Sequence, residues 1–124
     1  MFAKFDFEAK QAIYMAGEES RMLGHSHIDP HMLVAGILKW YGSSNPPPEF
    51  SGFTLQSYRD LIVHKKGRGY DPAKPCLSHT PSYINVLKYA SDHNDRVTVK
   101  ALIDAIVACN STADPYSDVF SKGF

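Results

Sequence analysis

The sequence predicts an all-α protein built from two pseudo-symmetric repeats of helical motifs that form one compact domain. Apolar residues recur with helical spacing, and no alternating run is long enough to indicate a β-strand. Residues typical of helix starts precede these runs, and the pattern of the first half returns in the second. At 124 residues the chain is long enough for one domain with its own hydrophobic core.

The first helix is predicted over residues 7–22. Asp6 is a good N-cap, and the apolar positions that follow have the spacing of one helical face: Ala9, Ala12, Ile13 and Ala16. Charged residues, Glu18, Glu19 and Arg21 among them, are expected on the remaining surface. Gly24 supplies the left-handed residue that commonly closes a helix.

A second helix is predicted from Asp29-Pro30, where an N-cap is followed by proline at the first helical position. Residues 32–38 are apolar on nearly every side, so this helix should be central and buried. The proline-rich segment 42–52 reads as a loop. Thr54 can cap a third helix, which ends near Gly67.

The second half repeats this pattern. Thr80-Pro81 is another cap-and-proline start, and the apolar positions of its helix lie 74 residues after those of the first, as Tyr83 does after Ala9. Thr98 caps the next buried helix, which follows its counterpart by 69 residues and includes Val107 among its apolar positions. A last short helix is expected from Asp114-Pro115.

We expect residues 1–124 to form a single domain, with repeat one at about 1–66, a linker at about 67–78 and repeat two at about 79–120.

The composition excludes several classes of partner. The 13 basic and 13 acidic residues give a net charge of zero, so nothing draws the whole domain to nucleic acid or to an anionic membrane. The one basic cluster, residues 64–68, is expected to complement a helix end. No apolar run approaches the ~20 residues of a membrane span. With no signal peptide at the start, a cytoplasmic protein with Cys76 and Cys109 reduced is expected.

A family resemblance rests mainly on residues 1–38: the MFAKF start, the EESRMLGH stretch that ends the first helix, Ile28, and the buried MLVAGIL helix. In these segments the chain resembles the Clp N-terminal domain, the double-repeat helical module at the front of Clp/Hsp100 AAA+ unfoldases, and most of all its ClpC type. Over residues 79–120 only the cap, the apolar positions and the order of the elements match.

The resemblance implies a non-catalytic, cofactor-free protein-binding module of a Clp-type ATP-dependent protease or chaperone system. Such a module docks substrate or adaptor proteins, or regulates the AAA+ ring as an accessory subunit. The chain has no GxxxxGK[ST] loop and therefore no means of its own to hydrolyse ATP. The sequence is compatible with an excised domain of a larger ATPase and with a stand-alone protein.

Some ClpC-type domains bind phosphoarginine through a threonine at the start of each repeat and a glutamate near the start of each second helix. By the resemblance, the threonine positions fall on Asp6 and Thr80, and the glutamate positions on His31 and Lys100. Lys100 would repel a guanidinium, and His31 cannot form the bidentate pair of a carboxylate. We therefore expect no phosphoarginine binding.

Aromatic residues flank the proline-rich loop, and two interpretations remain open. The side chains either fold back onto the core, which we favour, or form an exposed patch for a partner. The predicted protein-binding residues are Asp6, His31, Met32, Trp40, Tyr41, Phe50, Thr80 and Lys100.

The alternative hypothesis is a small all-α metal-binding protein or enzyme centred on His25, His27 and His31. Three imidazoles can hold zinc, but no nearby cysteine or regularly placed carboxylate completes this set, so no metal site is expected. A cysteine hydrolase would need a base and an orienting acid beside Cys76 or Cys109. Cys109 lies on the apolar side of its helix and is expected to be a core residue, so no catalytic residue is assigned.

Overall fold

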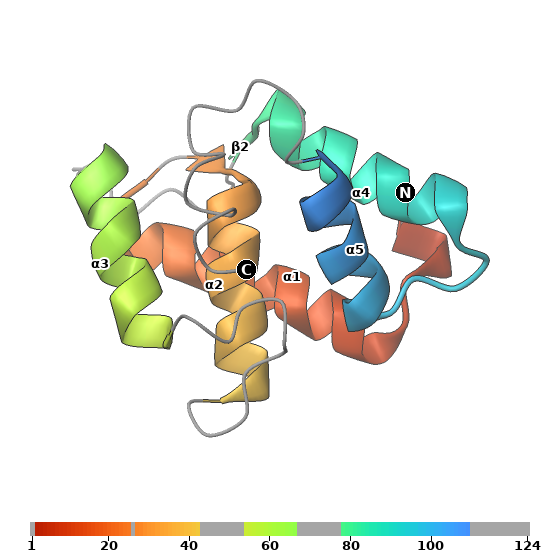
Figure 1. The fold of residues 1–124 in the computed structure, drawn as a ribbon, viewed down its shortest axis with the longest axis horizontal. Coiled ribbons are helices and arrows are strands. Elements are labelled where there is room, and N and C mark those ends of the chain that lie inside the picture. Colours follow the sequence, from red (N-terminus) through yellow and green to blue (C-terminus); the bar gives the residue numbers. More distant parts are fainter. Residues whose placement is uncertain (1, 26, 43–53, 67–77, 110–124) are drawn as a thin grey trace.

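The computed structural model describes residues 2–25, 27–42, 54–66 and 78–109. Over these ranges the protein is all-α, as predicted, with two very short strands (Figure 1). The elements in chain order are the 3₁₀ turn η1 (Phe2–Lys4), α1 (Phe7–Met22), β1 (His27–Ile28), α2 (Pro30–Tyr41), α3 (Leu55–Lys66), β2 (Ser78–His79), α4 (Pro81–His93) and α5 (Val99–Cys109).

The predicted caps start the helices. The Asp6 side chain accepts a hydrogen bond from the Ala9 amide in α1, and Asp29 accepts one from the Met32 amide in α2. In repeat two, Thr80 caps α4 and Thr98 caps α5 in the same way, through Tyr83 N and Ala101 N. Each cap satisfies an amide that has no partner within its own helix, which explains why the helices begin where the sequence predicts.

Two further predictions about helix termini are confirmed, the start of α3 at Thr54 and the end of α1 at Gly24. The Thr54 hydroxyl accepts from the Ser57 amide at 3.0 Å, and the Ser57 hydroxyl accepts from the Thr54 amide at 2.9 Å, so α3 begins with a reciprocal cap. Gly24 has a φ of 75° after the end of α1, the left-handed conformation expected of a glycine at this position.

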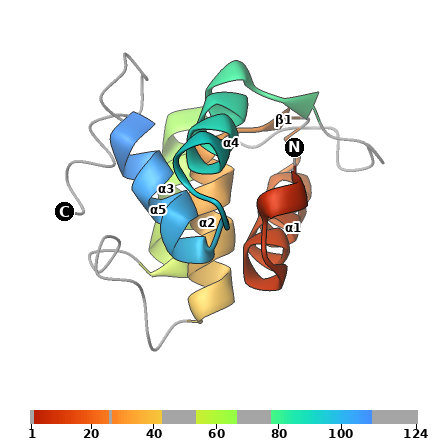
Figure 2. The ribbon, with the colours of Figure 1, turned by 90° about the vertical axis from the view of Figure 1, so that its right-hand side faces the viewer.

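The helix α2 lies at the centre of the molecule. It contacts α1, α3, α4 and α5, and its residues from Pro30 to Leu38 are all buried. Turned by 90°, the molecule shows α2 between α5 and α1, with α4 above (Figure 2). The prediction of a central, buried second helix is therefore confirmed.

The contact between α1 and α2 is made backbone to backbone at Gly36. A Cβ atom added there would lie 2.6 Å from the Ala12 carbonyl oxygen and 2.6 Å from the Ala16 amide nitrogen. Ala12 and Ala16 are themselves fully buried. Because the distance between two packed helices depends on the side chains at their crossing, these small residues set how deeply α2 sits on α1.

Two parallel pairings join the repeats. Ile28 of β1 pairs with His79 of β2, and Phe5 forms an isolated bridge with Val97. Their hydrogen bonds correspond as well: Thr80 N donates to Ile28 O at 3.0 Å, and Asp6 N donates to Val97 O at 2.9 Å.

These two pairings are symmetry copies of each other. Shifting Phe5 by 74 residues gives His79, and shifting Ile28 by 69 gives Val97, the same offsets that relate the helices. Each pairing joins the residues before the first helix of one repeat to those before the second helix of the other. The repeats therefore form one pseudo-symmetric body through reciprocal backbone contacts.

The structure corrects the sequence-based description at three points. The strands were not predicted, because two residues are too few to show an alternating pattern. Glu19, expected on the surface, is only 1% exposed, while Val107, expected in the core, is 43% exposed. The loop at 42–52, the linker at 67–78 and the last helix from Asp114 lie wholly or almost wholly outside the described residues.

We predict that Gly36→Ala lowers the free energy of unfolding by about 1–3 kcal/mol, because the new methyl group forces α2 away from the α1 backbone. Gly17→Ala is the matched control: its Cβ would meet the Ile28 side chain at 3.8 Å and Arg21 Nη1 at 4.0 Å, both ordinary van der Waals distances. This second change should be neutral or stabilise the helix by up to about 1 kcal/mol. Urea denaturation of both variants measures the difference, and equal effects would contradict the proposed role of Gly36.

Candidate functional site

Four of the predicted binding residues, Asp6, His31, Thr80 and Lys100, lie at helix starts on two symmetry-related surfaces. The bridge between Phe5 and Val97 joins the chain before α1, with Asp6, to the chain that enters α5, with Lys100. The pairing of β1 with β2 likewise joins the chain before α4 to the chain before α2. It brings Thr80, just before α4, to the same side as His31, the second residue of α2. The structure thus places the four residues as two corresponding sets.

The Asp6 surface is open to solvent on its charged side. Beyond capping α1, the Asp6 carboxylate lies 3.8 Å from Arg96 Nε, and the Arg96 side chain is 76% exposed. Lys100, the second residue of α5, is 63% exposed and forms an ion pair with Asp104 at 3.1 Å. Exposed pairs contribute little stability, so Arg96 and Lys100 are available to a partner at low cost, whereas the Asp6 side chain is only 11% exposed.

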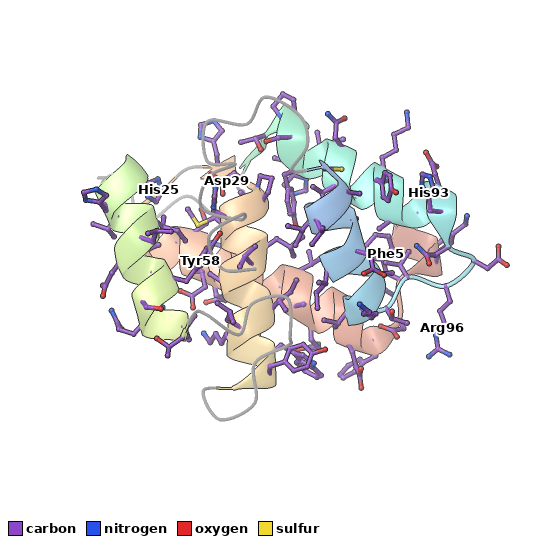
Figure 3. All side chains as sticks on the ribbon, viewed as in Figure 1. Phe5, His25, Asp29, Tyr58, His93 and Arg96 are labelled. Carbon is purple, nitrogen blue, oxygen red and sulfur yellow. The ribbon has the colours of Figure 1, made fainter. Side chains whose placement is uncertain are left out.

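At the Thr80 surface, His31 is covered. It is 3% exposed, and its Nδ1 atom lies 2.7 Å from the hydroxyl of Tyr58, which α3 contributes and which is itself fully buried. Thr80 remains partly exposed, with its hydroxyl 3.2 Å from the Ser82 hydroxyl. The corresponding residues His31 and Lys100 therefore have opposite environments, one buried beneath α3 and the other exposed. Figure 3 shows Tyr58 and Asp29 toward one end of the molecule and Arg96 toward the other.

The remaining predicted residues are less accessible. Met32 is fully buried in α2 and offers no surface to a partner. Trp40 and Tyr41 are half-buried and pack against the core, as favoured from the sequence. Phe50 lies outside the described residues. Of the predicted binding residues, Lys100 is therefore the one whose side chain is mostly exposed in the described part of the chain.

An ion pair between Glu19 and Arg59 was missed by the sequence analysis. Arg59 Nη2 donates to Glu19 Oε1 at 2.6 Å, and Arg59 Nε donates to Oε2 at 3.0 Å, a bidentate arrangement that ties α3 to α1. The Glu19 side chain has no exposed surface, and that of Arg59 is 22% exposed. A sequence signal existed, because Glu19 continues the series of buried positions Ala9, Ala12 and Ala16.

Large apolar side chains on α1 were also not assigned to any site. Phe7 is 71%, Tyr14 63% and Met22 50% exposed, all on the helix face opposite the core. Exposed apolar residues gathered on one element are candidates for protein contacts.

The three histidines of the alternative hypothesis do not gather into a metal site. Within the described ranges, no group of three or more His, Cys, Asp or Glu residues could hold a metal ion. His31 is instead engaged by Tyr58. Cys109 is half-buried at the end of α5 rather than in the core, and this burial raises the pKa of its thiol, which opposes thiolate formation.

The geometry defines a helical double-repeat module with two corresponding helix-start surfaces. No protein-family model matches the chain. Among solved structures, the chain is similar to the N-terminal domain of the caseinolytic protease associated chaperone ClpD from Arabidopsis thaliana. The TM-score is 0.73 at 15% sequence identity, over 97% of this chain and 83% of that chain.

The chain therefore has the fold of a Clp N-terminal domain, as the resemblance in residues 1–38 predicted. Across the described part of the chain, no helix is long and apolar enough to cross a membrane.

Two fully buried tyrosines should respond to the same substitution with opposite signs. Tyr58→Phe removes the hydrogen bond to His31 and should destabilise the protein by about 1–3 kcal/mol. The Tyr83 hydroxyl has no hydrogen-bond partner among the described residues, so Tyr83→Phe should be neutral or stabilising. Thermal and urea unfolding of both variants measure the effects, and a larger loss for Tyr83→Phe would contradict these assignments.

The pH dependence gives a second measurement on Tyr83. Burial raises the pKa of Tyr83 above its ordinary value of 10.0, so its phenol stays protonated in the fold while the unfolded chain ionises. Stability is thus fully present below about pH 10 and falls as the pH rises further. This alkaline loss should be smaller in Tyr83→Phe.

Proposed function

We propose that the protein is a non-catalytic protein-binding module of a Clp-type ATP-dependent protease or chaperone system. It docks substrate or adaptor proteins, or regulates the AAA+ ring, in the cytoplasm. The observation that supports this most is the likeness to a Clp chaperone N-terminal domain over 97% of the chain. The metal-binding or enzymatic alternative has less support, since His31 is buried and hydrogen-bonded to Tyr58.

The open surface near Lys100 is the best candidate for the contact. Lys100 and Arg96 extend into solvent from the start of α5 and the turn before it, and Asp6 lies beside Arg96. The exposed Phe7 follows Asp6 directly and adds an apolar group to the charged ones. Charged rims around apolar anchors are typical of protein–protein interfaces.

We predict that the immobilised chain captures a Clp-type AAA+ ATPase, or an adaptor or substrate of one, and that Lys100→Glu weakens the capture by about tenfold, or 1.4 kcal/mol. The matched control is Lys88→Glu, which reverses an exposed charge on α4. Affinity capture with the purified ATPase, followed by surface plasmon resonance, measures both. Failure to bind the ATPase, its adaptors and its substrates would refute the proposed function.

We further predict that phosphoarginine gives no saturable binding in isothermal titration calorimetry. Lys100 would repel the guanidinium group, the Asp6 carboxylate would oppose the phosphate, and His31 is buried beneath Tyr58. Saturable heats at millimolar ligand would contradict the prediction.

A further inference from the structure

We propose that α3 is a displaceable helix, which occupies a docking face on repeat one that an arginine-bearing, apolar segment of a partner protein can occupy in its place. The face consists of Glu19 on α1, His31 on α2 and the apolar part of the core that Tyr58 and Ile62 of α3 cover. This inference goes beyond the proposed function and does not depend on it.

The chemistry of the face requires a cation. Glu19 has no exposed side-chain surface, and its carboxylate receives three contacts from the Arg59 guanidinium, at 2.6, 3.0 and 3.2 Å. A buried carboxylate without a counter-charge is strongly destabilising. Any segment that replaces α3 must therefore supply a positive group at this point, and arginine alone matches the carboxylate with a bidentate fork.

The rest of the face selects an apolar segment with helical spacing. Tyr58 is fully buried against His31, and Ile62, one turn later, is 3% exposed. Together with Arg59 these residues occupy positions i, i+1 and i+4 of α3. A partner helix with an aromatic residue, an arginine and a branched apolar residue at this spacing would reproduce the contacts of α3.

The residues of repeat two that correspond to this face are exposed. The offsets of 74 and 69 residues place His93 at the position of Glu19 and Lys100 at that of His31. His93 and Lys100 are both exposed, and no described helix covers them as α3 covers their counterparts. Among the described residues, the corresponding position of repeat two is therefore exposed, whereas in repeat one it is occupied by α3.

The position of α3 is peripheral to the contacts that join the two repeats. Figure 1 shows α3 at one end of the molecule, with α2 between it and α5. The crossing of α1 and α2 at Gly36 and the two pairings between the repeats involve no residue of α3. Its attachment depends on the Glu19–Arg59 pair, the His31–Tyr58 hydrogen bond and the apolar contacts of its buried face, which includes Tyr58 and Ile62.

The test supplies α3 in trans. In the full chain, Arg59→Ala should loosen the resident helix, and a fluorescent peptide of residues 54–66 should then bind with saturation in fluorescence polarisation. Binding to the unaltered chain should be at least about tenfold weaker, because its face is occupied. The same peptide carrying Arg59→Ala should not bind, and the chain with Glu19→Gln and Arg59→Ala together should lose the preference for the arginine.

Hydrogen–deuterium exchange on the same variants separates local opening from unfolding. Arg59→Ala should speed exchange in α3 by at least about tenfold while α4 and α5 keep their protection. Arg59→Lys, which retains the charge without the fork, is a milder variant should Arg59→Ala not fold. Arg21→Ala is the matched control, since it removes an arginine from α1 that pairs with Glu18 outside this face.

Three results would overturn the proposal. In the first, amides of α3 exchange rapidly in the Arg59→Ala chain, yet the peptide of residues 54–66 does not bind, or binds equally well with and without its arginine. Another is unchanged exchange of α3 in both Arg59 variants. The third is loss of protection in all helices together, which would make α3 part of the cooperative core.

Discussion

The close approach of α2 to α1 at Gly36 is the contact on which the rest of the structure depends. It lets α2 lie against the backbone of α1, with the apolar sides of α2 in contact with α1, α3, α4 and α5. The crossing also sets where the chain before each helix emerges. Phe5 before α1 and Ile28 before α2 are thereby placed to pair with repeat two. The absence of a side chain at Gly36 thus helps to determine how the two repeats are placed relative to each other.

The two repeats share a backbone plan but differ in the chemistry of their surfaces. Asp6 and Thr80 both cap a first helix and both donate their amide to the opposite repeat. Near the starts of the second helices, His31 is buried while Lys100 is solvated. His31 is buried because α3 packs against it, whereas no described helix packs on Lys100 in this way, so duplicated geometry need not mean duplicated binding properties. A partner that binds one of the two surfaces is therefore not expected to bind the other.

Much of the helical framework follows from local signals. Asp6, Asp29, Thr80 and Thr98 each satisfy nearby amides, and this interaction is settled within four residues of chain. The apolar spacing identified which faces are buried, with Glu19, Val107 and Cys109 as exceptions. The burial of Glu19 is tertiary in origin: Arg59, forty residues later, neutralises its charge, and no local pattern contains that partner.

The fold class, the helix starts and the repeat were therefore accessible from the order of residues alone, because caps and helical periodicity act over a few positions. The short parallel pairings, the shielding of His31 by Tyr58 and the ion pair of Glu19 were not. Each of them joins segments that are far apart in the chain and are neighbours only in the folded protein. The protein's binding surfaces are products of that packing, since packing determines which of two corresponding side chains meets solvent.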